Sequence, residues 1–154
     1  MMRKDREVTD FAEIVDIVRR ADTIRLGLHD EPYPYVVPLS FGFEAADGKI
    51  VFYFHGAQKG LKCELIKGNP HVCVEAGIFH RYLEVQGGGY TVEYESFIGF
   101  GKAARVTGDE ACRGLDLLMD HCSFERVKYD RVTVDNTAVY KIEIASFTSK
   151  RRSV

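Results

Sequence analysis

Apolar residues alternate with polar or small ones through several short segments of this chain, and a spacing of two indicates β-strands. Residues 24–28 form the first such segment and residues 35–43 the second. In the third, Lys49–His55, the alternation places one apolar set on a single face: Ile50, Phe52 and Phe54. Asp47-Gly48, just before it, is typical of a two-residue type I′ hairpin turn. The chain is therefore expected to be rich in antiparallel strands.

Three other segments show helical spacing. The first is expected from about Asp10 to Arg20, with Asp10 as its N-cap. A short helix begins near Leu61 and ends at Gly68-Asn69-Pro70, and a third follows Asp109, which can cap it. Further strands are expected at His71–Ala76, about Thr91–Val106 and Val139–Phe147, whereas Gly77–Gly89 is weakly patterned and Gly87–Gly89 indicates a flexible turn.

Six or seven strands with three short helices favour an antiparallel barrel or an α+β sheet over a doubly wound fold. The 154 residues, 45% of them hydrophobic, are expected to form one domain over 1–154. The net charge of -2 gives no reason to expect nucleic acid or an anionic membrane as partner. The charged start and the lack of a stretch of about 20 apolar residues predict a cytoplasmic protein.

The four cysteines lack the C-x2-C pairing of zinc sites, so reduced and mostly buried thiols are the simplest interpretation. The equal gaps from Cys63 to Cys73 and from Cys112 to Cys122 leave a metal cluster with His121 as a weaker alternative. We predict no metal site.

Residues 54–62 run from a strand end into a helix start and combine two glycines with Lys59 and Lys62. Free N–H groups at a helix N-terminus and two cations suit an anion. The P-loop pattern is absent, so a terminal phosphate is the better-sized ligand. An ordinary turn with two solvated lysines explains this segment equally well.

Three blocks of the sequence resemble the nitroimidazole-resistance family of the pyridoxamine-phosphate-oxidase-like split barrels. They are PYVVPLSFGF (34–43), VFYFHGAQKGLK (51–62) and YESFIGFGKA (94–103). The resemblance implies a mainly β (α+β) fold, a six-stranded antiparallel Greek-key split β-barrel with short peripheral helices. It also implies a homodimer with one FMN in each of two clefts between the subunits.

The same resemblance implies roles for residues in each block. Val37, Pro38, Leu39, Ser40 and Phe41 would lie along the flavin ring through backbone groups, with Tyr53 and Phe54 leading toward it. Lys59, Gly60 and Lys62 would face the phosphate, and His55 is the expected catalytic residue beside the flavin. Tyr94, Ser96, Lys150 and Arg151 would also approach the cofactor, the last two in one interpretation from the partner subunit.

The function expected from this resemblance is an FMN-dependent oxidoreductase that passes electrons from a reduced nicotinamide to a small acceptor such as a nitroaromatic. Oxidation of vitamin B6 is not expected, because the chain ends TSKRRSV and lacks the R-x-H substrate motif. Two alternatives stay open. One is a flavin or haem carrier or sensor with His55 as a possible iron ligand, and the other is a dimeric protein without cofactor. The remaining histidines are assigned no role: His29, His71, His80 and His121.

Overall fold

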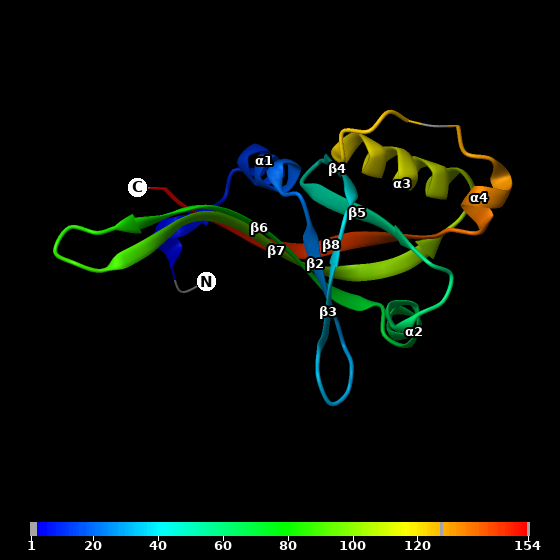
Figure 1. Cartoon of the computed structure of the whole chain (residues 1–154), viewed down its shortest axis with the longest axis horizontal. Coiled ribbons are helices and arrows are strands. Elements are labelled where there is room, and N and C mark those ends of the chain that lie inside the picture. Colours follow the sequence, from blue (N-terminus) through cyan, green and yellow to red (C-terminus); the bar gives the residue numbers. More distant parts are fainter. Residues whose placement is uncertain (1–2, 127, 154) are drawn as a thin grey trace.

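A single antiparallel sheet of eight strands organises the chain in the computed structural model, which describes residues 3–126 and 128–153 (Figure 1). In chain order the elements are η1 (Lys4–Arg6), β1 (Glu7–Val8), α1 (Phe11–Arg20), β2 (Ile24–Leu28), β3 (Tyr35–Leu39), β4 (Gly42–Ala46), β5 (Lys49–Gly56), α2 (Leu61–Gly68), β6 (His71–Glu84), β7 (Tyr90–Val106), α3 (Gly108–His121), α4 (Arg131–Asp135) and β8 (Ala138–Arg152).

The order of the strands makes this sheet a split barrel. It runs β3-β2-β6-β7-β8-β5-β4, with β1 paired to β8. The two ends of the order, β3 and β4, are separated in sequence only by Ser40 and Phe41. The sheet must therefore curl round on itself. This confirms the predicted fold class.

The prediction of six strands was wrong, and two local features explain the difference. The strand expected over residues 35–43 breaks into β3 and β4 at the Ser40–Phe41 corner. The short β1, which pairs Glu7 with Lys150 and Val8 with Ser149, adds the eighth. A strand of two residues is too short to show any alternation, so β1 could not be predicted from the sequence.

The inward face of the barrel holds an aromatic and aliphatic core. Ile50, Phe52 and Phe54 are each at most 1% exposed, so the predicted face of β5 is confirmed. Phe52 lies 5.5 Å from Phe41 and 5.7 Å from Phe97, measured between ring centroids. Burial of this set excludes water from the barrel and fixes the strand ends that carry the candidate site.

The helices cover the barrel from outside. Asp10 caps α1 by accepting a hydrogen bond from the Glu13 N–H at 2.9 Å, as predicted. The prediction that Asp109 caps the third helix was wrong, because α3 begins at Gly108 and its N-cap, Thr107, makes no side-chain hydrogen bond. The helix α4 was not predicted. None of the helices among residues 3–126 and 128–153 has both the length and the apolar character needed to cross a membrane.

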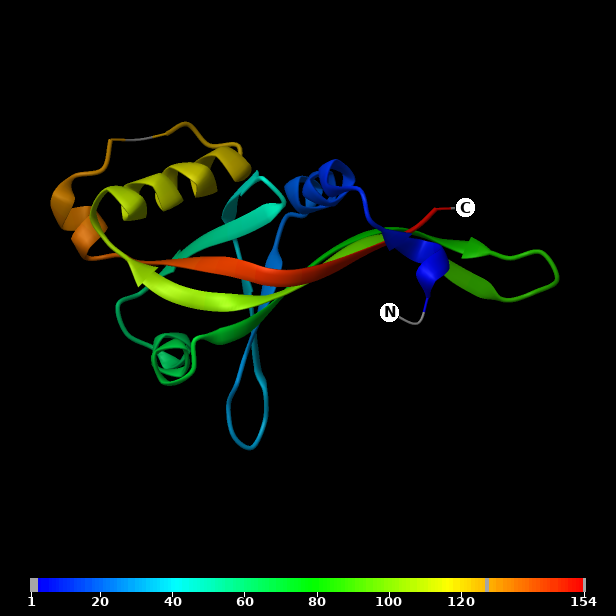
Figure 2. The same cartoon turned by 180° about the vertical axis from the view of Figure 1, so that it is seen from behind.

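The outer parts of β6 and β7 leave the barrel as a long two-stranded arm, the green hairpin in Figures 1 and 2. Pairing continues to Glu84 and Tyr90, with a bulge between Phe79 and Arg81. The weakly patterned region Gly77–Gly89 is thus mostly strand, and only its last residues form the turn. The last strand, expected to end at Phe147, also continues to Arg152 and places the basic C-terminal residues inside the sheet.

Candidate functional site

The junction between β5 and α2 gathers the cationic residues predicted for the phosphate. The Lys62 side chain turns back over the barrel end, where its Nζ lies 5.4 Å from the Phe54 ring centroid. The Phe54 ring is itself fixed by stacking on Tyr140, with centroids 5.1 Å apart and planes 8° from parallel. The aromatic platform holds the ammonium at the strand end instead of letting it extend into solvent.

Glycine is needed on both sides of this ammonium. A Cβ at Gly56 would lie 2.9 Å from Lys62 Nζ, so any side chain there would compete for the position of the ammonium. Gly60, the N-cap of α2, has a φ of 143° and offers no side-chain acceptor to the first turn. The Cys63 N–H donates to the Gly60 carbonyl oxygen at 3.0 Å, so the N–H groups of Leu61 and Lys62 are the ones offered to an anion at this helix start.

His55 is the titratable group next to this cation. Its side chain retains an exposed edge at the end of β5. Partial burial lowers the pKa of the imidazole from its usual 6.5, and the positive charge of Lys62 lowers that pKa further. The ring is consequently neutral at pH 7, with one nitrogen able to donate a hydrogen bond and the other able to accept one.

The β3–β4 corner lies at the same end of the barrel as His55. β4 starts with Gly42 opposite Tyr53, so Ser40 and Phe41 extend beyond that pair toward the end of β5. The corner and the β5–α2 junction therefore form one group of predicted site residues within a single chain.

Side chains of β3 alternate about this edge strand of the sheet. Pro38 and Ser40 are exposed on the outside, whereas Val37 and Leu39 are partly buried against the core. The Phe41 side chain is completely buried, which leaves only its backbone for a ligand. The edge position of β3 leaves backbone groups unpaired by any other strand among the described residues.

Tyr53 and Phe54 support the site from below. Tyr53 is 3% exposed under α3, and its hydroxyl donates a hydrogen bond to Glu44 Oε1 at 3.1 Å. Burial, and then the charge of Glu44, raise the pKa of the Tyr53 hydroxyl to about 12. Phe54 is 1% exposed. Neither side chain reaches the surface, so both act on a ligand only through the residues that they position.

The remaining predicted residues lie at the root of the arm. Ser96 is paired with Lys150, and the Ser149 hydroxyl donates to the Ser96 carbonyl at 2.9 Å. Tyr94, two residues closer to the tip of the arm along β7, is paired with Arg152. These residues form a second group, on β7 and β8.

Arg151 in this second group is held by carboxylates. It pairs with the buried Glu95 and, at 2.8 Å, with Glu13 of α1. Glu95 also accepts from Arg20, and it lies 3.3 Å from His80 Nε2. Burial by itself would raise the pKa of the Glu95 carboxyl, but the hydrogen bonds from Arg20, Arg151 and His80 outweigh it and lower this pKa to about 2. Sequence reasoning missed this network because its members are far apart in the chain.

The β5–α2 junction is too far from the second group to meet it in one chain. Phe54 is paired with Tyr140, and Ser96 with Lys150, on the same strand β8. At about 3.3 Å per residue, these positions are roughly 30 Å apart along β8. A single small ligand cannot touch both the β5–α2 junction and Lys150 of the same molecule.

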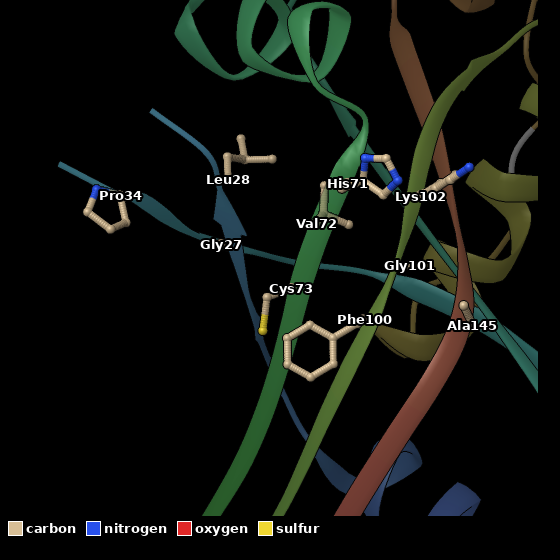
Figure 3. Close-up of a pocket in the computed structure, with 10 residues that line it drawn as sticks. All are labelled: Gly27, Leu28, Pro34, His71, Val72, Cys73, Phe100, Gly101, Lys102 and Ala145. Carbon is tan, nitrogen blue, oxygen red and sulfur yellow. The ribbon is translucent and has the colours of Figure 1, made fainter. Parts of the chain in front are cut away.

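An apolar pocket lies on the outer face of the sheet (Figure 3). It has a volume of about 690 Å³ and a floor of Gly27, Cys73 and Phe100, which are neighbours across β2, β6 and β7. His71 and Lys102, also paired across the strands, stand at its rim. None of the predicted cofactor-binding residues lines it. The sequence signal for this pocket is the alternation of exposed residues along β7, but that alternation indicates a pocket only when the register of β7 with β6 and β2 is known.

The cysteines form no cluster with other ligands. All four are free thiols, and only Cys63 is buried. Across residues 3–126 and 128–153, no group of three or more His, Cys, Asp or Glu side chains is arranged to hold a metal ion.

Comparison with solved structures confirms the resemblance stated from the sequence. A candidate 5-nitroimidazole antibiotic resistance protein from Bacteroides thetaiotaomicron is 29% identical, with a TM-score of 0.83 over 94% of this chain and 85% of that one. A flavocytochrome from Azotobacter vinelandii is 18% identical, with a TM-score of 0.78 over 96% of this chain and 70% of that one. An FAD and haem binding protein from Mycobacterium smegmatis is 17% identical, with a TM-score of 0.77 over 97% and 74%.

The family assignment comes from the sequence as a whole. No curated protein matches this chain significantly. Residues 10–151, from the N-cap of α1 to the penultimate residue of β8, match the family described as pyridoxamine 5'-phosphate oxidase. The chain therefore belongs to the pyridoxamine 5'-phosphate oxidase family.

Proposed function

We propose that this protein binds FMN between two copies of the chain and acts as an FMN-dependent oxidoreductase that reduces a small acceptor. The observation that carries the proposal is the Lys62 ammonium held over Phe54 and against Gly56, next to the uncapped start of α2. This arrangement supplies a fixed cation and free backbone N–H groups at one point. Those are the donors that a terminal phosphate requires.

The residues present fit the phosphate end of a flavin nucleotide. Gly60 leaves the helix start open, and Lys59 adds a second cation beside it. The exposed edge of β3 near Ser40 offers backbone groups to a flat polar ring. A nucleotide triphosphate fits less well, because the junction lacks the longer loop and the hydroxyl side chain of a P-loop.

Two copies are required if both groups of residues serve one flavin. Lys150 and Ser96 are about 30 Å from the β5–α2 junction of their own chain, as judged from the strand rise. A second copy can bring its own Ser96 and Lys150 to the first copy's Lys62. The homodimer is therefore part of the proposal.

A bound flavin would supply the electron transfer, accepting electrons from a reduced nicotinamide and passing them to the acceptor. The protein's own residues bind the flavin, orient the acceptor and exclude water. The neutral imidazole of His55 holds a hydrogen bond or a proton at one ring nitrogen beside the site. Similarity to the candidate resistance protein of Bacteroides thetaiotaomicron supports a nitroaromatic as the acceptor class.

A flavin or haem carrier is the second candidate. Its support is the lowered pKa of His55, because only a neutral imidazole binds iron. Two relatives of the same fold are a flavocytochrome and an FAD and haem binding protein. This candidate predicts a haem spectrum after growth with haem and no flavin reduction by nicotinamides.

Purified protein should be titrated with FMN, FAD and haem, and the flavin complex mixed anaerobically with NADH or NADPH. We expect tight FMN binding and loss of the oxidised flavin absorbance with one of the nicotinamides. Lys62→Ala should weaken FMN binding by about 10- to 100-fold, the effect of losing one charged hydrogen bond. Lys67→Ala, in the last turn of the same helix, should change it little. Equal affinities for the two variants would refute the phosphate site.

A further inference from the structure

The helix α3 packs on β4 and β5, the two strands that lead to the candidate site (Figure 1). β4 begins directly after the Ser40–Phe41 corner, and β5 carries His55. Gly114, Leu118 and His121 of α3 meet these strands and the corner. Their spacing of four and three residues places them on one face of the helix. One face of α3 therefore supports both parts of the chain that lie at this end of the barrel.

The first two contacts bring backbone and ring atoms very close together. A Cβ on Gly42 would lie 2.3 Å from the backbone nitrogen of Leu118, and a Cβ on Gly114 would lie 2.7 Å from Tyr53 Cδ1. Neither position has room for a side chain. The start of β4, one residue after Phe41, is therefore held directly against α3, without a flexible side chain between them.

The third contact is made by His121, a histidine outside the proposed flavin site. Its Nε2 lies 2.8 Å from the carbonyl oxygen of Ala21, the C-cap residue of α1. Because a carbonyl oxygen can only accept, Nε2 carries a proton and donates it to this bond. The bond joins the ends of α1 and α3, and it fixes the orientation of the imidazole ring.

The fixed imidazole rests on Phe41. The two ring centroids lie 4.1 Å apart, and the ring of Phe43 meets the same imidazole edge-on at 5.8 Å. On the side of the barrel core, Phe41 lies 5.5 Å from Phe52. The Phe41 side chain is completely buried by these neighbours. It therefore anchors the corner to α3 as well as to the core.

This anchor matters because the corner has little other support. Ser40 and Phe41 lie between β3 and β4, outside the strand pairings of the described residues. Ser40 is exposed, and Phe41 offers a ligand only its backbone. The direction in which these backbone groups point is set by the Phe41 ring on one side and by Gly42 on the other.

We propose that His121 is a positioning residue for the flavin ring, because it holds Phe41 and thereby fixes the backbone of the Ser40–Phe41 corner that faces the ring. The inference rests on the proposed function. It divides flavin recognition between two supports, with α3 and His121 serving the ring, and Lys62 at the start of α2 serving the phosphate. His121 itself acts only through Phe41.

Ligands that carry only one end of the flavin test this division. Riboflavin has the ring without the phosphate, and inorganic phosphate competes with FMN for the other end. His121→Ala should weaken riboflavin and FMN binding by about tenfold each, because the ligand must then order the corner itself. It should leave the phosphate affinity unchanged. Lys62→Ala should weaken FMN and phosphate binding and leave riboflavin unchanged.

Two further variants separate ring positioning from general support of the fold. His121→Gln keeps an N–H donor for the Ala21 carbonyl oxygen but lacks the ring on Phe41, so it should bind riboflavin and FMN as weakly as His121→Ala. The visible absorbance bands of FMN bound to either variant should lie closer to those of free FMN than in the wild type. His29→Ala, at an exposed histidine after β2, should change neither affinity nor spectrum.

Each outcome has a defined meaning. A His121→Gln chain that binds riboflavin and FMN as the wild type does overturns this inference, and its FMN binding shows that the proposed function survives. An equal loss of flavin and phosphate affinity in both His121 variants also overturns it, since His121 would then support the whole fold. A wild-type chain that binds neither riboflavin nor FMN refutes the proposed function and this inference with it.

Discussion

The carboxylate of Glu95 should be a major source of stability at neutral pH. It lies 5% exposed between α1, β6 and β8, with Arg20, Arg151 and His80 donating to it. These donors lower its pKa from the ordinary 4.5 to about 2, against the opposing effect of burial. A difference of roughly 2.5 pKa units corresponds to about 3 kcal/mol, at 1.36 kcal/mol per unit.

This stabilisation depends on pH with a definite sign. In the unfolded chain the Glu95 carboxyl has its ordinary pKa, so the native state holds the charged form more strongly. The contribution is therefore complete above about pH 4.5 and is lost as the pH falls through the folded value near 2. Stability should decline over that window.

The perturbation is Glu95→Gln, which keeps the size of the side chain but removes its charge. We expect a loss of about 2–3 kcal/mol at pH 7, because two arginines then face a neutral group, and a smaller loss near pH 3. The assay is urea unfolding at one fixed protein concentration at both pH values, with Glu125→Gln as control. A Glu95→Gln loss that is under about 0.5 kcal/mol at pH 7, or that does not shrink at pH 3, would refute this reasoning.

Three further predictions concern single positions. A flavin phosphate would neutralise Lys62 and so raise the pKa of His55. FMN affinity should therefore rise more between pH 8 and pH 6 for the wild type than for His55→Gln. Identical pH profiles of the two proteins in isothermal titration would argue against an effect of the phosphate on His55. Gly101→Ala should destabilise the protein by about 2–3 kcal/mol or more, because the added Cβ would lie 2.2 Å from the Glu143 carbonyl oxygen. Gly68→Ala should cost much less, because a Cβ there would have open space around it. Thermal unfolding of the two variants compares these costs. Asp10→Ala should cost about 1 kcal/mol of stability through loss of the cap on α1. Asp22→Ala, at an exposed position, should cost little. Denaturant midpoints of the two variants that coincide would contradict the stabilising role of the cap.

Local features of this protein were predictable from its sequence because they depend on neighbouring residues. The Asp10 cap and the Asp47–Gly48 turn, with φ of 51° and 74°, are set by a few adjacent residues. The junction from His55 to Lys62 is likewise contained in eight consecutive residues. Its cluster of glycines and cations could therefore be recognised before the fold was known.

The corner between β3 and β4 could not be found from the pattern. Tyr35, Val37, Leu39, Phe41 and Phe43 all pack toward the core, so the alternation continues unchanged through the break. The arm was missed for the opposite reason. A two-stranded arm has no buried face, and without burial there is no selection for alternating apolar residues.

The remaining features of the fold and of the candidate site depend on contacts between segments that are far apart in the sequence. The Glu95 network includes a pair of residues 138 positions apart, Glu13 and Arg151. The pocket floor joins Gly27, Cys73 and Phe100 through strand register. No local pattern encodes a register between strands so far apart in the sequence. The roughly 30 Å between the β5–α2 junction and Lys150 also became visible only when both were placed along β8.

The flavin site shared between two copies is tested most directly by complementation. Lys62→Ala and Lys150→Ala chains, each expected to hold FMN weakly, are mixed under conditions that exchange subunits. Half of the dimers should be mixed, and each mixed dimer should have one intact site, so bound FMN should rise to about a quarter of the sites. Bound FMN that stays at the average of the two variants, or a Lys150→Ala chain that binds FMN as the wild type does, would contradict a shared site.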